Sequence, residues 1–165
     1  MILLRKGREK DLSSIQEIAK KTWGPTYSGI ISQEQIDYML EKMYNKGVLL
    51  EQLLAGYVFL IAELEDKDVG FASYSKLGDS NVVYKLHKLY VLPEAHGKGL
   101  GKLLINEVFD KVKEAGGKSL ELNVNRANKS TEFYKNAGFK IKETVNLDIG
   151  NGFFMNDYVL EKAIL

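Results

Sequence analysis

The sequence HGKGLGK at residues 96–102 places three glycines at alternate positions, between a β-rich run that ends at Pro93 and a run with helical spacing. A strand that leads through a glycine loop into a helix presents unpaired backbone N–H groups at the positive end of the helix dipole. Glycines lack the Cβ atoms that would block close approach, and Lys98 and Lys102 add positive charge beside the amides. The pattern predicts a phosphate-binding loop.

Two common nucleotide-binding motifs fit this loop poorly. The dinucleotide pattern G-x-G-x-x-G, counted from Gly97, requires a glycine where Lys102 stands. A Walker loop requires Ser or Thr after its Gly-Lys pair, and here Leu103 follows. A nucleotide-binding module that uses the same loop stays open as an alternative, as does a loop that merely needs positive φ angles.

The composition narrows the class of protein. The 165 residues suit a single domain, residues 1–165, and Lys+Arg 23 against Asp+Glu 22 gives no overall basic field, so we expect neither a nucleic-acid partner nor a membrane. The chain has no Cys and two His, which excludes disulfides and thiolate nucleophiles and disfavours a metal site. No apolar run approaches the length of about 20 residues that a bilayer requires. We expect a cytoplasmic location.

Apolar periodicity and turn residues predict the secondary structure. Helices are expected from Asp11 or Ser13 to about Gly24-Pro25, after a capping box of Ser32 and Gln35, from Leu100 to Gly116-Gly117, and over 130–137. The β-rich runs are 2–6, 57–63, 69–76, 82–92, 120–124, 139–147 and 153–159. This order predicts a mixed α/β (α+β) fold, a sheet of about six to seven strands flanked by about four helices.

Two segments, LHKLYVLPEAHGKGLGKLLINEV and NKSTEFYKNAGF, together resemble the GCN5-related N-acetyltransferase (GNAT) superfamily, and most closely the branch with bacterial polyamine (spermidine/spermine) acetyltransferases. The resemblance covers nearly the whole chain. It implies a sheet with a splayed middle and transfer of an acetyl group from acetyl-CoA to an amine, with the CoA pyrophosphate on residues 96–102. The sequence departs from the family pattern at His96, where Gln or Arg is usual, and at Ala127, where Asn is frequent.

The resemblance also implies the donor site. Backbone groups near Leu89 and Val91 would pair with the pantetheine arm, which then acts as an additional strand. The Leu89 N–H would stabilise negative charge on the thioester oxygen. The expected cofactor-binding residues are Leu89, Tyr90, Val91, His96, Gly97, Lys98, Gly99, Leu100, Gly101, Lys102, Asn125, Asn128 and Tyr134.

Two side chains are candidates for proton transfer. An alkylamine has a pKa near 10.4, so a base must remove its proton before it attacks, and His with a pKa near 6.5 suits this role. His87 lies two residues before Leu89, and strand alternation puts both on one face unless a bulge intervenes. A structural histidine with a fixed partner is the alternative. Tyr134 occupies the position of the family's general acid, which would protonate the departing thiolate.

The acceptor is less well defined. Trp23 and Tyr27 lie where the family builds the acceptor wall, and a core role for Trp23 is the alternative. A small cationic amine could meet carboxylates such as Glu34, Asp37 or Glu94. Without Cys, we expect direct transfer in a ternary complex. A non-catalytic acyl-CoA-binding domain on the same fold stays open as an alternative, and the protein could be a monomer or a homodimer.

Overall fold

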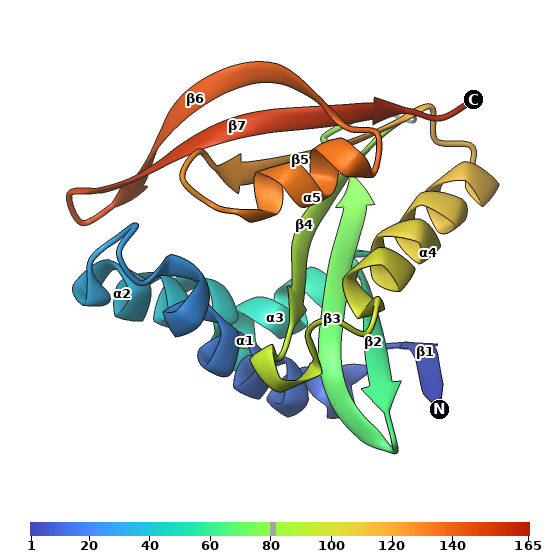
Figure 1. Ribbon diagram of the computed structural model, residues 1–165, viewed down its shortest axis with the longest axis horizontal. Coiled ribbons are helices and arrows are strands. Elements are labelled where there is room, and N and C mark those ends of the chain that lie inside the picture. The colour runs from blue at the N-terminus through green and yellow to red at the C-terminus, as the bar shows by residue number, and fades with distance from the viewer. Residues whose placement is uncertain (80–81) are drawn as a thin grey trace.

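The computed structural model describes residues 1–79 and 82–165 and has one mixed sheet of seven strands (Figure 1). The strands lie in the order β1-β2-β3-β4-β5-β7-β6. Their bounds are β1 Ile2–Lys6, β2 Val58–Leu64, β3 Lys67–Lys76, β4 Val83–Val91, β5 Ser119–Asn125, β6 Lys140–Gly150 and β7 Phe153–Ala163. The predicted fold class is confirmed.

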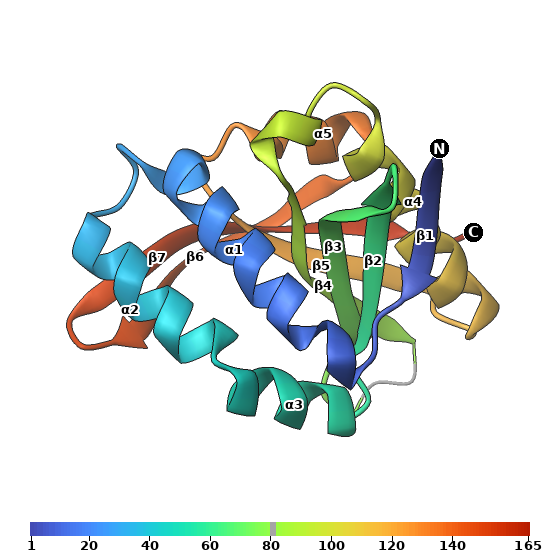
Figure 2. The same ribbon diagram turned by 90° about the horizontal axis from the view of Figure 1, so that it is seen from below.

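Five α-helices flank the sheet within the described ranges: α1 Leu12–Tyr27, α2 Gln33–Tyr44, α3 Lys46–Leu54, α4 Leu100–Glu114 and α5 Ser130–Asn136. Helix α1 crosses β3 and β4 on one face, while α4 packs on the same two strands from the other face (Figure 2). Short 3₁₀ turns, Glu9–Asp11 and Pro93–Ala95, precede α1 and the glycine loop. The sheet is therefore covered on both faces at its centre.

The predicted end of the first helix is wrong. Helix α1 continues through Pro25 to Tyr27. The additional turn buries Tyr27 against Trp23, with ring centroids 4.6 Å apart, and this aromatic contact outweighs the missing backbone donor of the proline.

Helix α3 was not expected from the sequence, which predicted about four helices rather than five. Asn45 begins it, because its side-chain oxygen accepts the Val48 N–H at 2.9 Å. At the start of α2, Ser32 accepts the Gln35 N–H at 3.1 Å, which forms half of the predicted capping box. The Gln35 side chain instead donates to the Phe154 carbonyl at 2.6 Å and so ties α2 to β7.

Two pairs of the predicted β-rich runs form hairpins. Glu65 and Asp66 connect β2 to β3 with φ of 49° and 65°, the left-handed pair that a two-residue turn requires. Residues 150–152 connect β6 to β7, also with positive φ.

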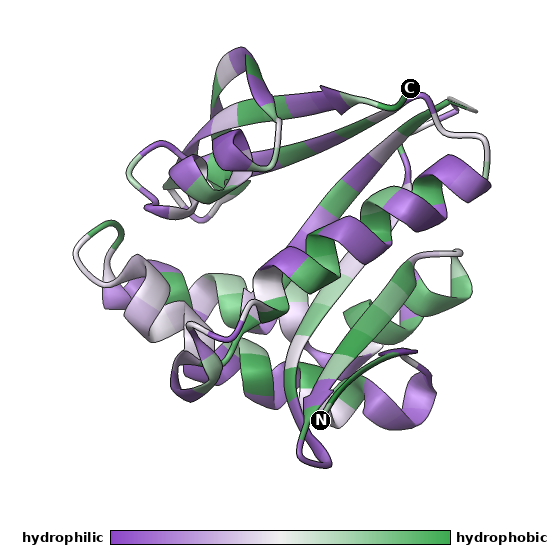
Figure 3. Ribbon diagram, turned by 45° about the vertical axis from the view of Figure 1, so that its right-hand side comes forward, coloured by the Kyte–Doolittle hydropathy of each residue, from purple (hydrophilic) through white to green (hydrophobic). Residues whose placement is uncertain are grey.

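The core lies between the sheet and its helices. Figure 3 shows that hydrophobic residues dominate β2 and β3, whereas α4 alternates between hydrophobic and hydrophilic positions. Phe59, Ile61 and Phe71 are fully buried on the face of these strands where Phe71 contacts the rings of Tyr44 and Tyr90. Leu104 and Val108 of α4 are fully buried on the other face, where Leu104 lies beside Gly70 of β3. Burial of this apolar surface holds α4 against the sheet, which fixes where the glycine loop before it lies.

The sheet opens at its centre. Strand β4 pairs with β3 along its length, up to Val91, but its parallel ladder with β5 joins only Val83–Leu86 to Ser119–Leu122. Beyond Leu86 the two strands diverge (Figure 1). The splayed middle that the sequence resemblance implied is therefore present, and it creates the space described next.

Candidate acetyl-transfer site

A cavity of about 470 Å³ fills the opening between β4 and β5. Its walls come from β4, the glycine loop, the start of α4, β5 and α5, with Thr26 and Tyr27 of α1 at one side. The predicted site residues that line it are Tyr27, His87, Leu89, Tyr90, Val91, His96, Gly97, Gly99, Leu100, Gly101, Lys102, Asn128 and Tyr134. Trp23, Glu34, Lys98 and Asn125 do not line it.

The β4 wall presents backbone groups. The Leu92 N–H donates to Val69 of the β3 side at 2.8 Å. In an antiparallel pair, successive residues direct their N–H and C=O groups to opposite sides. The N–H groups of Leu89 and Val91 are therefore directed away from β3, into the cavity where β5 has separated. A ligand with its own amide groups could complete this edge of the strand.

The glycine loop forms a cradle at the end of the cavity. Gly97 and Gly99 have φ of 82° and 76°, and a Cβ added to either would meet no heavy atom within 4 Å. Gly99 is the N-cap of α4, so the first N–H groups of that helix open toward the loop. Lys102 lines the cavity beside them, whereas the side chain of Lys98 lies outside. The arrangement fits an anionic group such as a pyrophosphate.

His96 has a definite partner at the start of this loop. Its Nε2 lies 2.8 Å from the Val91 carbonyl oxygen. A carbonyl can only accept, so Nε2 carries the proton in this contact. The imidazole thus ties the loop to the end of β4, while still lining the cavity.

Tyr134 covers the cavity from α5. Its side chain is 7% exposed and packs at steep angles against the rings of Phe133 and Phe139. Burial raises the pKa of Tyr134 above the ordinary value of tyrosine, so the phenol keeps its proton at neutral pH. It can act as a proton donor but is a poor base.

His87 lies at a β-bulge. Ser73 pairs with Lys88 and Tyr74 with Leu86, which leaves His87 as the additional residue. The predicted shared face with Leu89 therefore does not follow from simple alternation. The imidazole stacks on Tyr57, with centroids 4.5 Å apart, and its Nε2 lies 2.7 Å from Ser75 Oγ.

The surroundings of His87 also weaken it as a base. Burial, followed by the charges of Lys88 and Lys85, lowers the pKa of His87 to about 3. The ring is neutral at pH 7, but such a low pKa makes it a poor proton acceptor.

An aromatic cluster of Trp23, Tyr27, Tyr44 and Tyr90 lies behind β4. Trp23 is 2% exposed and packs against the other three rings, as a core residue does. The hydroxyls of Tyr27 and Tyr90 are 3.2 Å apart. Tyr27 is thereby fixed at the cavity wall, where the sequence placed it.

Sequence reasoning missed several residues of the site. Lys88 lines the cavity, is 5% exposed and donates to Gln52 Oε1 at 3.0 Å. Burial lowers the pKa of Lys88 to about 8. On β5, Asn123 also lines the cavity. The polar alternation of Glu121, Asn123 and Asn125 was the available signal, and it is typical of a solvent-facing side, yet Glu121 and Asn125 are buried.

In the part of the chain that the structure describes, no three His, Cys, Asp or Glu side chains gather as a metal site would require. No helix there is both long and apolar enough to cross a membrane.

The model of the acetyltransferase (GNAT) domain family matches residues 28–161. The chain belongs to the GNAT acetyltransferases. Over 167 aligned residues it is 29% identical to a spermidine N(1)-acetyltransferase of Thermoplasma acidophilum, covering 98% of this chain and 96% of that one. A solved structure of the PaiA N-acetyltransferase from the same organism, in complex with coenzyme A, superposes with a TM-score of 0.84 at 29% identity, covering 99% of both chains.

Other relatives act on different acceptors. An L-amino acid N-acyltransferase of Escherichia coli is 29% identical over 93 residues, or 53% of each chain. This GNAT N-acetyltransferase uses acetyl-CoA as its acetyl donor, and the glycine cradle and the edge of β4 beyond Leu86 suit that ligand.

Proposed function

We propose that this GNAT enzyme transfers the acetyl group of acetyl-CoA to a primary amine of a small polyamine, by direct attack in a ternary complex. The observation that carries the proposal is the opening between β4 and β5, which ends in a glycine cradle and is covered by Tyr134. The acceptor class rests on similarity to the spermidine acetyltransferase, which extends over nearly the whole chain.

In this proposal the donor lies along β4. The loop amides at 97–101 and the Lys102 ammonium bind the pyrophosphate, and the Val91 N–H binds an amide oxygen of the pantetheine arm. The Leu89 N–H is directed at the thioester oxygen, where it stabilises the negative charge that develops during attack. Asn128, whose side-chain oxygen accepts the Ser130 N–H at 2.8 Å, shapes the turn before α5.

The chemical step forms a C–N bond and breaks the C–S bond of the thioester. The attacking amine must first lose a proton, which for an alkylamine near pKa 10.4 costs about 5 kcal/mol at pH 7. The departing CoA thiolate then takes a proton from the Tyr134 hydroxyl. The nitrogen of the new amide gives up one proton to solvent, and the Tyr134 phenolate regains one from solvent. No Cys is present in the chain to carry the acetyl group, which supports direct transfer.

The base role of His87 has less support than the acid role of Tyr134. Its Nε2 already has Ser75 Oγ as partner, and its low pKa opposes proton uptake. These contacts favour the alternative in which His87 is a structural residue that holds the bulge of β4.

The test is release of free CoA thiol from acetyl-CoA with purified protein and a panel of polyamines, arylalkylamines, amino acids and peptides. Because the protein has no Cys, it gives no thiol background. We expect the highest kcat/KM with a polyamine. An arylalkylamine without a second amine, or an amino acid, whose kcat/KM equals or exceeds that of the best polyamine would contradict the proposed acceptor class.

A further inference from the structure

Asp157 of β7 is a buried carboxylate that the proposed chemistry does not use. Its side chain is 5% exposed, and its Oδ1 is buried without a hydrogen-bond partner among the residues that the structure describes. No ion pair joins it to any residue of the ranges 1–79 and 82–165. An ionised carboxylate in this position is costly unless something pairs with it.

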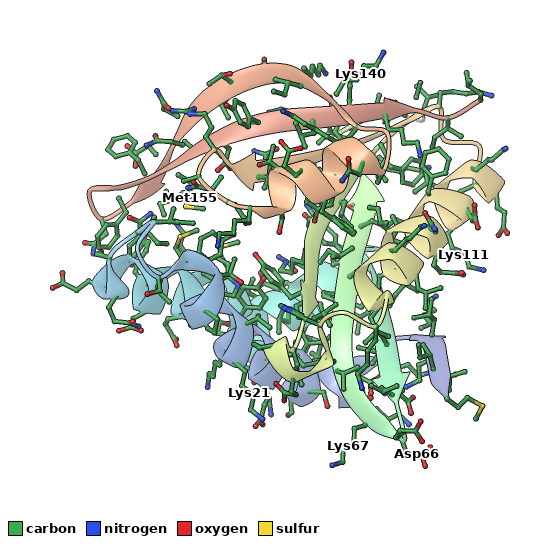
Figure 4. The ribbon with its side chains drawn as sticks, in the orientation of Figure 1. Lys21, Asp66, Lys67, Lys111, Lys140 and Met155 are labelled. Carbon is green, nitrogen blue, oxygen red and sulfur yellow. The ribbon has the colours of Figure 1, made fainter. Side chains whose placement is uncertain are left out.

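The register of the sheet fixes the direction in which Asp157 lies. Met155 precedes it by two residues, so both are on one face of β7. That face is turned toward α2: Figure 4 labels Met155, and its Sδ lies 3.6 Å from Gln35 Nε2 of that helix. Asp157 pairs with Asn125 of β5, so Asn123 is its diagonal neighbour on this face.

These neighbours connect Asp157 to the cavity. Asn123 and Tyr27 both line the cavity, and Asp157 lies behind them without lining it. A hydrogen bond from Asn123 opposes the rise in the pKa of Asp157 that burial causes. Burial raises the pKa of Tyr27, and the negative charge of Asp157 raises it further. The carboxylate therefore borders the side of the cavity that α1 closes.

The cations near Asp157 are held by other partners or are not paired with it. Lys85 and Arg126 act on it only through their fields, and they oppose the rise in pKa that burial causes. Arg126 donates to the Val145 and Asp157 backbone carbonyls and to Asn146 Oδ1, at 3.1, 3.2 and 2.8 Å. Among the described residues, no cation pairs with the Asp157 carboxylate. A cationic ligand can therefore serve as its counter-ion.

We propose that Asp157 binds the second, non-reacting ammonium group of a diamine or polyamine acceptor. This inference rests on the proposed function. The reacting nitrogen must reach the thioester beside Leu89 on β4, whereas Asp157 lies on β7, with β5 between them and with β4 and β5 diverging beyond Leu86. One nitrogen cannot occupy both places, so the carboxylate selects acceptors that carry another.

The experiment compares 1,4-diaminobutane with n-butylamine, which has the same carbon chain and one amine, as acceptors for wild type and Asp157→Asn. In wild type we expect kcat/KM for the diamine to exceed that for the monoamine at least tenfold. In D157N this ratio should fall about tenfold through KM for the diamine, with the monoamine and acetyl-CoA constants within twofold of wild type. Asp110→Asn, on the exposed side of α4, is the control for an equal change in charge.

Equal loss with both amines in D157N would assign Asp157 to the fold or to the chemistry and would overturn the inference. A wild type that does not discriminate between the amines would also overturn it, while the proposed function would stand. If wild type acetylated neither these two amines nor any polyamine of the panel, the proposed function would fail, and calorimetric titration of the CoA-bound protein with 1,4-diaminobutane would then decide the inference by itself. Binding in wild type that D157N abolishes supports it, and equal binding in both overturns it.

A stability measurement separates this role from a structural one. Removing an unpaired buried charge while keeping the shape of the side chain should leave Tm unchanged or raise it. A Tm of D157N clearly below that of wild type would identify Asp157 as a structural residue and contradict the proposal.

Discussion

The two walls of the cavity are built on different principles. The β4 wall, with the glycine loop that continues it, offers backbone N–H groups and the absence of side chains at Gly97 and Gly99. The β5 wall offers a polar side chain, Asn123, and Asp157 of the neighbouring strand β7 is buried behind it. Only the side chains of the second wall can change without disturbing the backbone.

In the proposed function, the first wall recognises the donor and the second recognises the acceptor. Backbone groups depend on the fold, so any sequence that keeps β4 splayed and the loop open can bind the same donor. Side chains on β5 and β7 can be exchanged one at a time, which allows relatives with different acceptors to share one architecture. The comparison predicts that substitutions in the first wall affect acetyl-CoA and those in the second affect the amine.

The largest expected effect is on a residue that covers both walls. Tyr134→Phe removes the proton donor but keeps the ring, so kcat should fall about 100-fold with both KM values little changed. Steady-state kinetics at saturating acetyl-CoA and amine measure this. Phe133→Leu, on the same helix, is the control for packing. Full turnover in Y134F with the wild-type pH profile would remove the acid role.

A substitution in the glycine loop tests the role of the β4 wall in donor binding. Gly99→Ala forces a residue with a Cβ into φ of 76°, which costs roughly 1–2 kcal/mol and so should raise KM for acetyl-CoA about tenfold. Gly29→Ala is the matched control, since Gly29 has φ of 81°, equally open surroundings and a position outside the cavity. Both variants should lose similar stability, and only G99A should lose affinity for acetyl-CoA. Equal KM values in the two would show that the loop conformation does not matter for the donor.

A smaller effect is expected from the two lysines of the loop. Lys102→Ala should raise KM for acetyl-CoA about threefold, and the difference should shrink as salt is added, because phosphate contacts by exposed cations are screened. Lys98→Ala should change it less, since only Lys102 lines the cavity. Kinetics at two ionic strengths measure both. A larger effect from K98A would reverse the assignment of the pyrophosphate ligand.

The smallest effect on turnover is expected from His87→Gln, with kcat within about threefold of wild type at saturating amine. Stability should respond instead. Because folding lowers the pKa of His87 from 6.5 to about 3, the unfolded chain binds more protons below pH 6.5, and wild type loses stability as the pH falls toward 3. H87Q has no imidazole to take up this proton. Between pH 7 and pH 5 its urea midpoint should therefore fall less than the urea midpoint of wild type.

Loss of kcat by about 100-fold in H87Q, without loss of stability at pH 7, would instead make His87 the base. Ser75→Ala is the companion variant, because it removes the partner of Nε2 and leaves the imidazole in place.

The sequence was most informative where one pattern determines one structure. The glycines at 97 and 99 do adopt positive φ, and the alternation of Leu120, Leu122 and Val124 does form a strand. It was least informative where tertiary contacts override local preference. Pro25 did not end α1, since burial of Tyr27 extends the helix, and the bulge at His87 reverses the expected alternation of β4.

Asn123 and Asp157 were missed for a similar reason. A polar residue at alternate positions of a strand is expected to face water, yet Asp157 and Asn125 are buried, on the face of the sheet where Met155 of β7 contacts Gln35 of α2. Nothing in the local pattern distinguishes these positions from exposed ones. Burial of such residues is a property of topology.

The parallel ladder between β4 and β5 is short, so bound acetyl-CoA would contribute to the stability of the sheet. Four residues on each strand connect the halves of the sheet, from Val83–Leu86 to Ser119–Leu122, and a bound pantetheine arm would extend that seam with hydrogen bonds of its own. Binding to the folded state alone stabilises it in proportion to the logarithm of ligand concentration. The abundance of acetyl-CoA would thus set how long each molecule survives heat or proteolysis as well as how fast it works. Acetyl-CoA would then be both a substrate of the enzyme and a ligand that holds the two halves of its sheet together.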